Sequence, residues 1–261
     1  MIIETISVAF GDRTEIFMRI TFLGSSHGLP EANRKCSSIL LEIAENRYII
    51  DAGTDITEPF ATKNLPLSSI RAILITHMHG DHTNGLIPFL QLCNWAYKDV
   101  NPDIFLPGDM EKTKAALEGW MACNSIYPPR AFLYKPVAPG AIYDDGTARF
   151  TAFPTKHTAV SYAYLLEAEG KRVLFSGDLS HSGPADDFPV SVLEKPLDLA
   201  ICEAAHFDAT DYLPILKGNQ NLKRLCFNHY SERYMCSVIE AKNQLSDIPV
   251  LIATDGMEIR L

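Results

Sequence analysis

Residues 71–85 read RAILITHMHGDHTNG and join an apolar run directly to a dense group of metal-competent side chains. The run AILI is typical of a strand that is covered on both faces. Four potential ligands follow within six residues, namely His77, His79, Asp81 and His82. Because four such side chains do not easily share one tetrahedron, their spacing predicts two neighbouring ions. The alternative is a surface loop rich in histidine by chance, which the preceding strand and the glycines of the segment disfavour.

Further β-rich runs with turn signals between them lie on both sides of this segment. Strands are predicted at 18–24, 37–44, 47–53, 71–77, 103–108, 148–155, 161–170, 171–178, 197–204, 223–230 and 248–256, and helices at 82–98, 110–124 and 231–244. Two groups of strands separated by helices predict an α+β fold with one domain over residues 1–261. We expect a four-layer αβ/βα sandwich, in which two mixed β-sheets pack together and the helices lie outside. The proline-rich stretch 127–140 is predicted to be a loop or insertion near the binding face, or a plain surface connection.

Three more candidate ligands stand at the ends of other predicted strands. They are His157, Asp178 and His229. A single histidine at a strand end is ordinarily a polar cap or a core residue. Three such residues recurring with the 77–82 cluster favour a shared metal site. Imidazole nitrogen and carboxylate oxygen suit Zn²⁺, and Mn²⁺ or Fe would also fit.

The composition limits the partners that the protein is expected to have. The formal net charge is −9, from 23 basic and 32 acidic residues, which disfavours a large nucleic-acid substrate because phosphate-backbone affinity depends on Lys and Arg. The six cysteines form no close C-x-x-C pair, which is typical of reduced, mostly buried thiols. Residues 1–17 lack a basic leader, and no apolar run reaches the ~20 residues of a membrane helix. The sequence therefore predicts a cytoplasmic protein with no membrane association.

Several segments together resemble the metallo-β-lactamase superfamily. The motif HMHGDH matches its H-x-H-x-D-H element, while FLGSSHGLP, LAICEAAHF and NHYSERY are similar to segments of its ribonuclease Z and phosphodiesterase branch. The resemblance implies the metallo-β-lactamase fold and two divalent metal ions. It implies that His77, His79 and His157 hold one ion. Asp81, His82 and His229 would hold the other, and Asp178 would bridge both.

The resemblance also implies a hydrolase that uses a hydroxide bridging two metals. We expect a small phosphodiester or cyclic phosphate as substrate, because no glycine-rich arm for gripping tRNA is apparent. The branch's separate catalytic histidine likewise has no clear counterpart before His229. Hydrolysis of a lactone, thioester or other acyl compound is an alternative, and so is a metal-binding protein without turnover. A homodimer is the expected oligomer.

A few residues near the ligands have candidate roles of their own. Asp81 is expected to orient the attacking hydroxide in addition to binding metal. Asp51 is expected to hydrogen-bond a ligand imidazole, or only to stabilise its own turn. His206 lies close to Glu203 in the sequence and is the candidate general acid, with a structural histidine as the alternative. His27 and His181 are further candidates for that role.

Overall fold

The computed structural model describes residues 18–29, 31–123 and 130–261, and within them the strands form two sheets. The first sheet contains, from edge to edge, β14 (Glu258–Arg260), β1 (Arg19–Gly24), β2 (Ser38–Ile43), β3 (Asn46–Ala52), β4 (Ile70–Leu74), β5 (Asp103–Leu106) and β6 (Leu133–Pro136). Pairing is antiparallel from β14 to β3 and parallel from β3 to β6. The sheet is therefore mixed.

The second sheet repeats this pattern with the second half of the chain. Its order is β13 (Val250–Ile252), β12 (Leu225–Tyr230), β11 (Leu199–Ala204), β10 (Lys171–Phe175), β9 (Ser161–Ala168), β8 (Arg149–Thr155) and β7 (Gly140–Asp144). Strands β7 to β10 pair antiparallel, and β10 to β13 pair parallel. Each sheet thus combines a meander with a parallel half.

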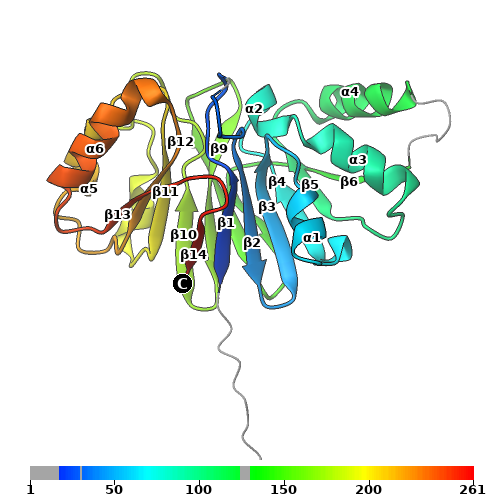
Figure 1. Ribbon diagram of the computed structural model, residues 1–261, viewed down its shortest axis with the longest axis horizontal. Coiled ribbons are helices and arrows are strands. Elements are labelled where there is room, and N and C mark those ends of the chain that lie inside the picture. The colour runs from blue at the N-terminus through cyan, green and yellow to red at the C-terminus, as the bar shows by residue number, and fades with distance from the viewer. Residues whose placement is uncertain (1–17, 30, 124–129) are drawn as a thin grey trace, which may run out of the picture.

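Helices cover the outer face of each sheet, so that the molecule has four layers (Figure 1). The first sheet carries α1 (Glu58–Thr62), α2 (Gly80–Thr83), α3 (Leu86–Trp95) and α4 (Met110–Ala122). The second sheet carries α5 (Leu213–Leu216) and α6 (Met235–Gln244). The predicted four-layer sandwich of two mixed sheets is therefore confirmed.

Apolar side chains fill the three spaces between these layers. The space between the sheets contains Phe22 and Tyr48 from one sheet and Phe150 and Phe175 from the other, all of them buried. Separate apolar clusters lie under the helices of the first and second sheets. Strands β2, β11 and β12 are buried at every residue, as expected for strands covered on both faces.

The structure corrects the prediction for the proline-rich stretch. Residues 133–136 form strand β6, which pairs in parallel with β5, and β7 begins at Gly140. Residues 127–129 of that stretch, like the absence of a leader expected for residues 1–17, lie outside the described residues. The sequence also missed β14, which pairs with β1 at the sheet edge.

The fold places several candidate ligands at one edge of the sandwich. The loops after β4, β8 and β10, together with the end of β12, carry His77, His157, Asp178 and His229. Three of these strands, β4, β10 and β12, belong to parallel pairs, whose carboxyl ends are the usual location of sites in such sheets. None of the helices in the described part of the chain is long and apolar enough to cross a bilayer.

Candidate metal centre

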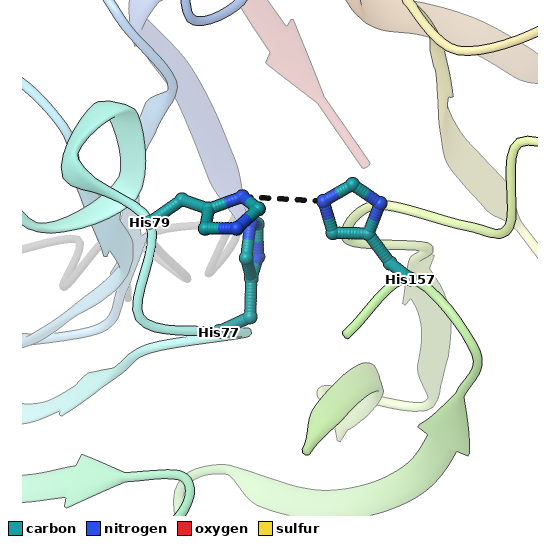
Figure 2. A group of neighbouring side chains, drawn as sticks. All are labelled: His77, His79 and His157. Atoms are coloured by element: carbon teal, nitrogen blue, oxygen red, sulfur yellow. Dashed lines mark hydrogen bonds between the residues drawn. The ribbon is translucent and has the colours of Figure 1, made fainter. Parts of the chain in front are cut away.

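Three histidines converge on one point from two different sheets. His77 follows β4, His79 immediately precedes α2, and His157 follows β8 (Figure 2). Nδ1 of His79 lies 3.2 Å from Nε2 of His157, and the three ligand atoms lie within 4.8 Å of one another. Nitrogen ligands at 2.0–2.1 Å from a tetrahedral zinc are about 3.4 Å apart, so this group has suitable spacing for one ion.

A second group of possible ligands lies next to the first. Nε2 of His82 is 3.6 Å from Oδ2 of Asp81, and Nε2 of His229 is 3.8 Å from that same oxygen. The three ligand atoms again lie within 4.8 Å of one another. Asp81, His82 and His229 are thus brought together in the combination that the sequence predicts for the other ion.

Asp178 lies between the two groups and is buried. Its Oδ2 is 3.6 Å from Nε2 of His157 and 3.2 Å from Nε2 of His229, while its Oδ1 is 3.4 Å from Nε2 of His82. One carboxylate therefore faces both groups. This is the position in which a carboxylate can bridge two ions.

The donor set passes a second test of whether metal ions fit it. Nε2 of His77, Nε2 of His82 and Oδ1 of Asp178 are buried and have no hydrogen-bond partner in the protein. Leaving a buried polar atom unpaired costs about 1–3 kcal/mol, more for a charged group. These three atoms belong to one histidine of each group and to Asp178 between them, and bound metal ions would satisfy them.

The local electrostatics favour the metal-binding forms of His77, His157 and Asp178. Burial, reinforced by the neighbouring His82, lowers the pKa of His77 to about 2, so its imidazole is neutral. Burial also lowers the pKa of His157. Burial would raise the pKa of Asp178, but the surrounding histidines, His229 first, hold it well below its usual value. Neutral imidazole and ionised carboxylate are the ligand forms.

Outer hydrogen bonds fix which nitrogen His157 and His229 present. Nδ1 of His157 donates to the carbonyl of Leu179 at 3.2 Å, and Nδ1 of His229 donates to the carbonyl of Ser26 at 3.1 Å. Because a carbonyl only accepts, these contacts place the proton on Nδ1 and leave Nε2 free as a ligand atom.

Asp51 orients His82 in the same way. Its Oδ2 accepts a hydrogen bond from Nδ1 of His82 at 2.7 Å. Its two oxygens also accept bonds from the backbone NH and the hydroxyl of Thr76, at 2.7 and 2.9 Å. The expected contact between Asp51 and an imidazole of the 77–82 cluster is therefore present, and Asp51 also connects the end of β3 to the loop after β4.

Glycines allow the loop that carries Asp81 to pack tightly against β3. A Cβ atom added to Gly53 would lie 1.8 Å from the carbonyl oxygen of Asp81, and one added to Gly85 would lie 1.8 Å from that of Thr54. A side chain at either position would push the ligand-bearing segment outward. This close approach explains why position 53, two residues after Asp51, requires a glycine.

His206 contacts Glu203 at the edge of the ligand groups. Its Nδ1 lies 2.8 Å from Oε2 of Glu203, and its Nε2 lies 3.8 Å from Oδ2 of Asp178. Burial lowers the pKa of His206, but the hydrogen bond and charge of Glu203 outweigh it, so the net shift is upward. His206 thus presents Nε2 toward the candidate metal centre.

The other two candidate histidines lie along the same cleft. The exposed His181 packs edge-on against His206, with ring centroids 4.7 Å apart. His27 is paired with Glu31, its Nε2 lying 3.1 Å from Oε1 of that residue. His181 is therefore beside His206, whereas His27 is already engaged by a neighbour in its own loop.

A cleft of about 480 Å³ opens beside Asp81 and Asp178. It is lined by His27, Gly28, Leu29, His79, Asp81, Asp178, His181, Ala205, His206, Ser231, Arg233 and Tyr234. Arg233 is the one Lys or Arg residue among these lining residues. The cleft has the size of a small-molecule site, and its lining can contact both an anion and an apolar group.

Two features of the site were not anticipated from the sequence. Buried Asp187 accepts hydrogen bonds from the backbone NH groups of Lys156 and Ser180, both at 2.7 Å, and so ties the loop of His157 to that of Asp178. Arg34 and Glu31 connect the loop of His27 to the turn after His229. Neither feature has a local motif, since each depends on contacts between distant segments.

Relatives of known sequence point to one branch of enzymes. The chain is 33% identical over 149 residues to a ribonuclease Z of Cyanothece sp., covering 56% of this chain and 46% of that protein. It is 31% identical over 152 residues to a ribonuclease Z of Acaryochloris marina, covering 58% and 48%. The chain thus spans about half the length of the curated relatives it matches.

Solved structures share the fold at low sequence identity. The metallo-β-lactamase fold protein YhfI from Bacillus subtilis superposes with a TM-score of 0.73 at 19% identity, over 94% of this chain and all of that one. The short form of human tRNase Z gives a TM-score of 0.71 at 20% identity, over 93% and 98%. These likenesses establish the metallo-β-lactamase fold.

The family model described as "Anti-Pycsar protein Apyc1" matches residues 18–185, which is more than half of the chain. The matched region includes His77, His79, Asp81, His82, His157 and Asp178. The chain therefore belongs to the Anti-Pycsar protein Apyc1 family and has the metallo-β-lactamase fold.

Proposed function

We propose that this protein is a two-metal phosphodiesterase that hydrolyses cyclic nucleotides. The observation that carries the proposal is the placement of His206, which is paired with Glu203, in a cleft that is also lined by the candidate ligands His79, Asp81 and Asp178. A proton donor at this position suits a reaction with an alkoxide leaving group. Membership of the Apyc1 family, taken together with this site, favours a cyclic nucleotide over other phosphodiesters.

The dimensions of the cleft and its hydrogen-bond donors support a small anionic substrate. Its volume of about 480 Å³ lies within the ~300–1,000 Å³ range of small-molecule sites. Arg233, His181 and His206 offer donors to a phosphate, while Leu29 and Tyr234 offer apolar surface to a base. A large polyanion would be repelled by the net charge of −9 on the whole chain.

The candidate site residues would have separate roles in the proposed reaction. His77, His79 and His157 would hold one ion, Asp81, His82 and His229 the other, and Asp178 would contact both. When bound, two divalent ions lower the pKa of water and offset charge that develops on a phosphoryl oxygen. Asp81 would accept a hydrogen bond from the attacking water and so orient its oxygen toward phosphorus.

His206 would complete the reaction at the leaving group. The bond between phosphorus and the ribose oxygen breaks as the bond to the water oxygen forms, which opens the cyclic diester to a monoester. His206 would give the proton on Nε2 to the departing ribose oxygen, while Glu203 keeps Nδ1 hydrogen-bonded. His181 lies close enough to His206 to contact the same phosphate.

The test combines metal analysis with a panel of substrates. We expect about two metal ions per chain and hydrolysis of 3′,5′-cyclic mononucleotides, which Asp81→Ala should abolish. Asp186→Ala, which changes an exposed carboxylate outside the cleft lining, should retain both properties. Turnover of a thioester or lactone alone, processing of a tRNA precursor alone, or two ions with no turnover of any substrate would each contradict the proposal.

A further inference from the structure

The side chain of Arg34 joins two chain segments that lie far apart in sequence. Its guanidinium group donates to the carbonyl of Tyr230 at 2.8 Å and to the carbonyl of Ser25 at 3.3 Å. It also forms an ion pair with Glu31 and lies 3.9 Å from the centroid of the Tyr230 ring. Only 13% of this side chain is exposed, so the contacts are largely shielded from water.

These contacts flank the hydrogen bond that orients His229. The carbonyl of Ser26 accepts from Nδ1 of His229 at 3.1 Å. Ser25 directly precedes Ser26, and Tyr230 directly follows His229. Arg34 therefore links the segment around Ser25 to the segment around Tyr230, at the residues next to this hydrogen bond.

Glu31 extends the connection on both sides. Its Oε2 accepts a hydrogen bond from the hydroxyl of Ser26 at 3.1 Å, and its Oε1 accepts one from the backbone NH of Glu232 at 3.1 Å. The backbone NH of Glu232 belongs to the turn that carries Arg233 into the cleft. The pair thus fixes both the Ser26 carbonyl and the turn after His229.

The backbone of His229 needs such support. Its φ of 49° lies in the left-handed region, which costs a residue other than glycine of order 1–3 kcal/mol. A conformation of this kind persists where surrounding contacts determine it. The Tyr230 carbonyl that Arg34 binds belongs to the next residue, so releasing it would let His229 relax toward an ordinary conformation.

We propose that Arg34, with Glu31, is a positioning residue that holds Nε2 of His229 in place to bind the ion shared with Asp81 and His82. The inference rests on the metal-binding role assigned above to these three residues. Loss of a group that orients a ligand typically weakens metal binding by about 10–100-fold. Arg34 acts on His229 through the neighbouring carbonyls of Ser25 and Tyr230, and would itself touch neither ion nor substrate.

The chain offers a matched control for this test. Arg47 pairs with Glu42 at 3.7 Å, its side chain is 11% exposed, and its partner lies on β2 outside the candidate site. Arg34→Gln and Arg47→Gln should both lower the stability of the fold. In a zinc titration followed by elemental analysis, only Arg34→Gln should raise the free zinc concentration needed to half-fill the second ion site, by tenfold or more. Its kcat should fall at limiting zinc and recover in excess zinc.

Wild-type zinc affinity in a folded Arg34→Gln protein would overturn the proposal, and so would an equal loss in Arg47→Gln. If Arg34→Gln does not fold, Glu31→Gln provides the same test with the shape of the side chain kept. The zinc titration separates this inference from the proposed function. A wild-type protein that binds two ions without hydrolysing a cyclic nucleotide would contradict the function and still allow the Arg34 comparison.

Discussion

Oε2 of Glu203 lies 2.8 Å from Nδ1 of His206, while Oε1 of Glu203 accepts a hydrogen bond from the backbone NH of Leu179 at 2.6 Å. The carbonyl of Leu179 accepts a hydrogen bond from Nδ1 of His157. Glu203 therefore connects the proposed proton donor to the loop that orients a proposed metal ligand. Its carboxylate is buried, so the contact is largely shielded from water.

This relationship predicts a dependence on the leaving group. His206→Ala should lower kcat for a cyclic nucleotide by about 10²–10⁴-fold, because the ribose oxygen needs a proton as it leaves. The loss should be much smaller for bis(p-nitrophenyl) phosphate, since p-nitrophenolate leaves readily without one. Steady-state kinetics on both substrates, with metal content measured in parallel, provide the check. Equal losses on the two substrates would show that His206 is not the acid.

The candidate ligands around His77 were recognisable because their signal is local. Four metal-competent side chains within six residues after an apolar strand restrict the chemistry without any knowledge of tertiary contacts. The same holds for most strands, whose apolar runs are buried in the structure as their composition indicates. Local patterns therefore predicted the layers and the 77–82 cluster, while the division of the candidate ligands into two groups came from the family resemblance.

Features that depend on distant contacts could not be predicted in this way. Strand β6 has a mostly exposed four-residue sequence, LYKP, which carries no apolar periodicity, and β14 has only three residues. Arg34 and Tyr230 are 196 positions apart, and no local sequence motif predicts their contact. The partners of Asp187 similarly follow from the folded arrangement of two loops.

Asp51→Asn should weaken the metal site while leaving the fold intact. Asp51 has a φ of 58°, and asparagine tolerates the left-handed region, so the backbone should be retained. Loss of the charge beside Nδ1 of His82 should weaken binding of the ion that His82 holds by about 10–100-fold. Zinc titration measures the effect, and circular dichroism verifies the fold.

Asp145→Asn is the control for Asp51→Asn. Asp145 accepts hydrogen bonds from the hydroxyl groups of Tyr48 and Tyr143 and from backbone NH groups. It contacts none of the proposed ligands. Its substitution should leave zinc affinity unchanged. A similar loss of zinc affinity in both variants would contradict a specific role for Asp51.

Two glycine substitutions should have opposite effects on stability. Gly53→Ala places a Cβ atom 1.8 Å from the Asp81 carbonyl and should destabilise the fold by about 1–3 kcal/mol, while also reducing metal content. Gly119 lies exposed in α4 with nothing within 4 Å of an added Cβ. Gly119→Ala should therefore stabilise the protein by about 0.5–1 kcal/mol. Chemical denaturation gives both values, and a neutral Gly53→Ala would refute the close contact.

Metal ions should stabilise the folded protein, because they bind atoms that are otherwise buried without a partner in His77, His82 and Asp178. Zinc at 100 times its Kd should add about 2.7 kcal/mol, which raises the Tm of a chain of this size by roughly 5–10 °C. Chelation should reverse the shift. Asp178→Asn keeps the shape of the side chain but removes the charge that faces both ligand groups, so zinc should raise its Tm far less. Thermal unfolding of both proteins, with zinc and with chelator, measures the difference. A full zinc-dependent shift in Asp178→Asn would mean that zinc stabilises the protein from another location.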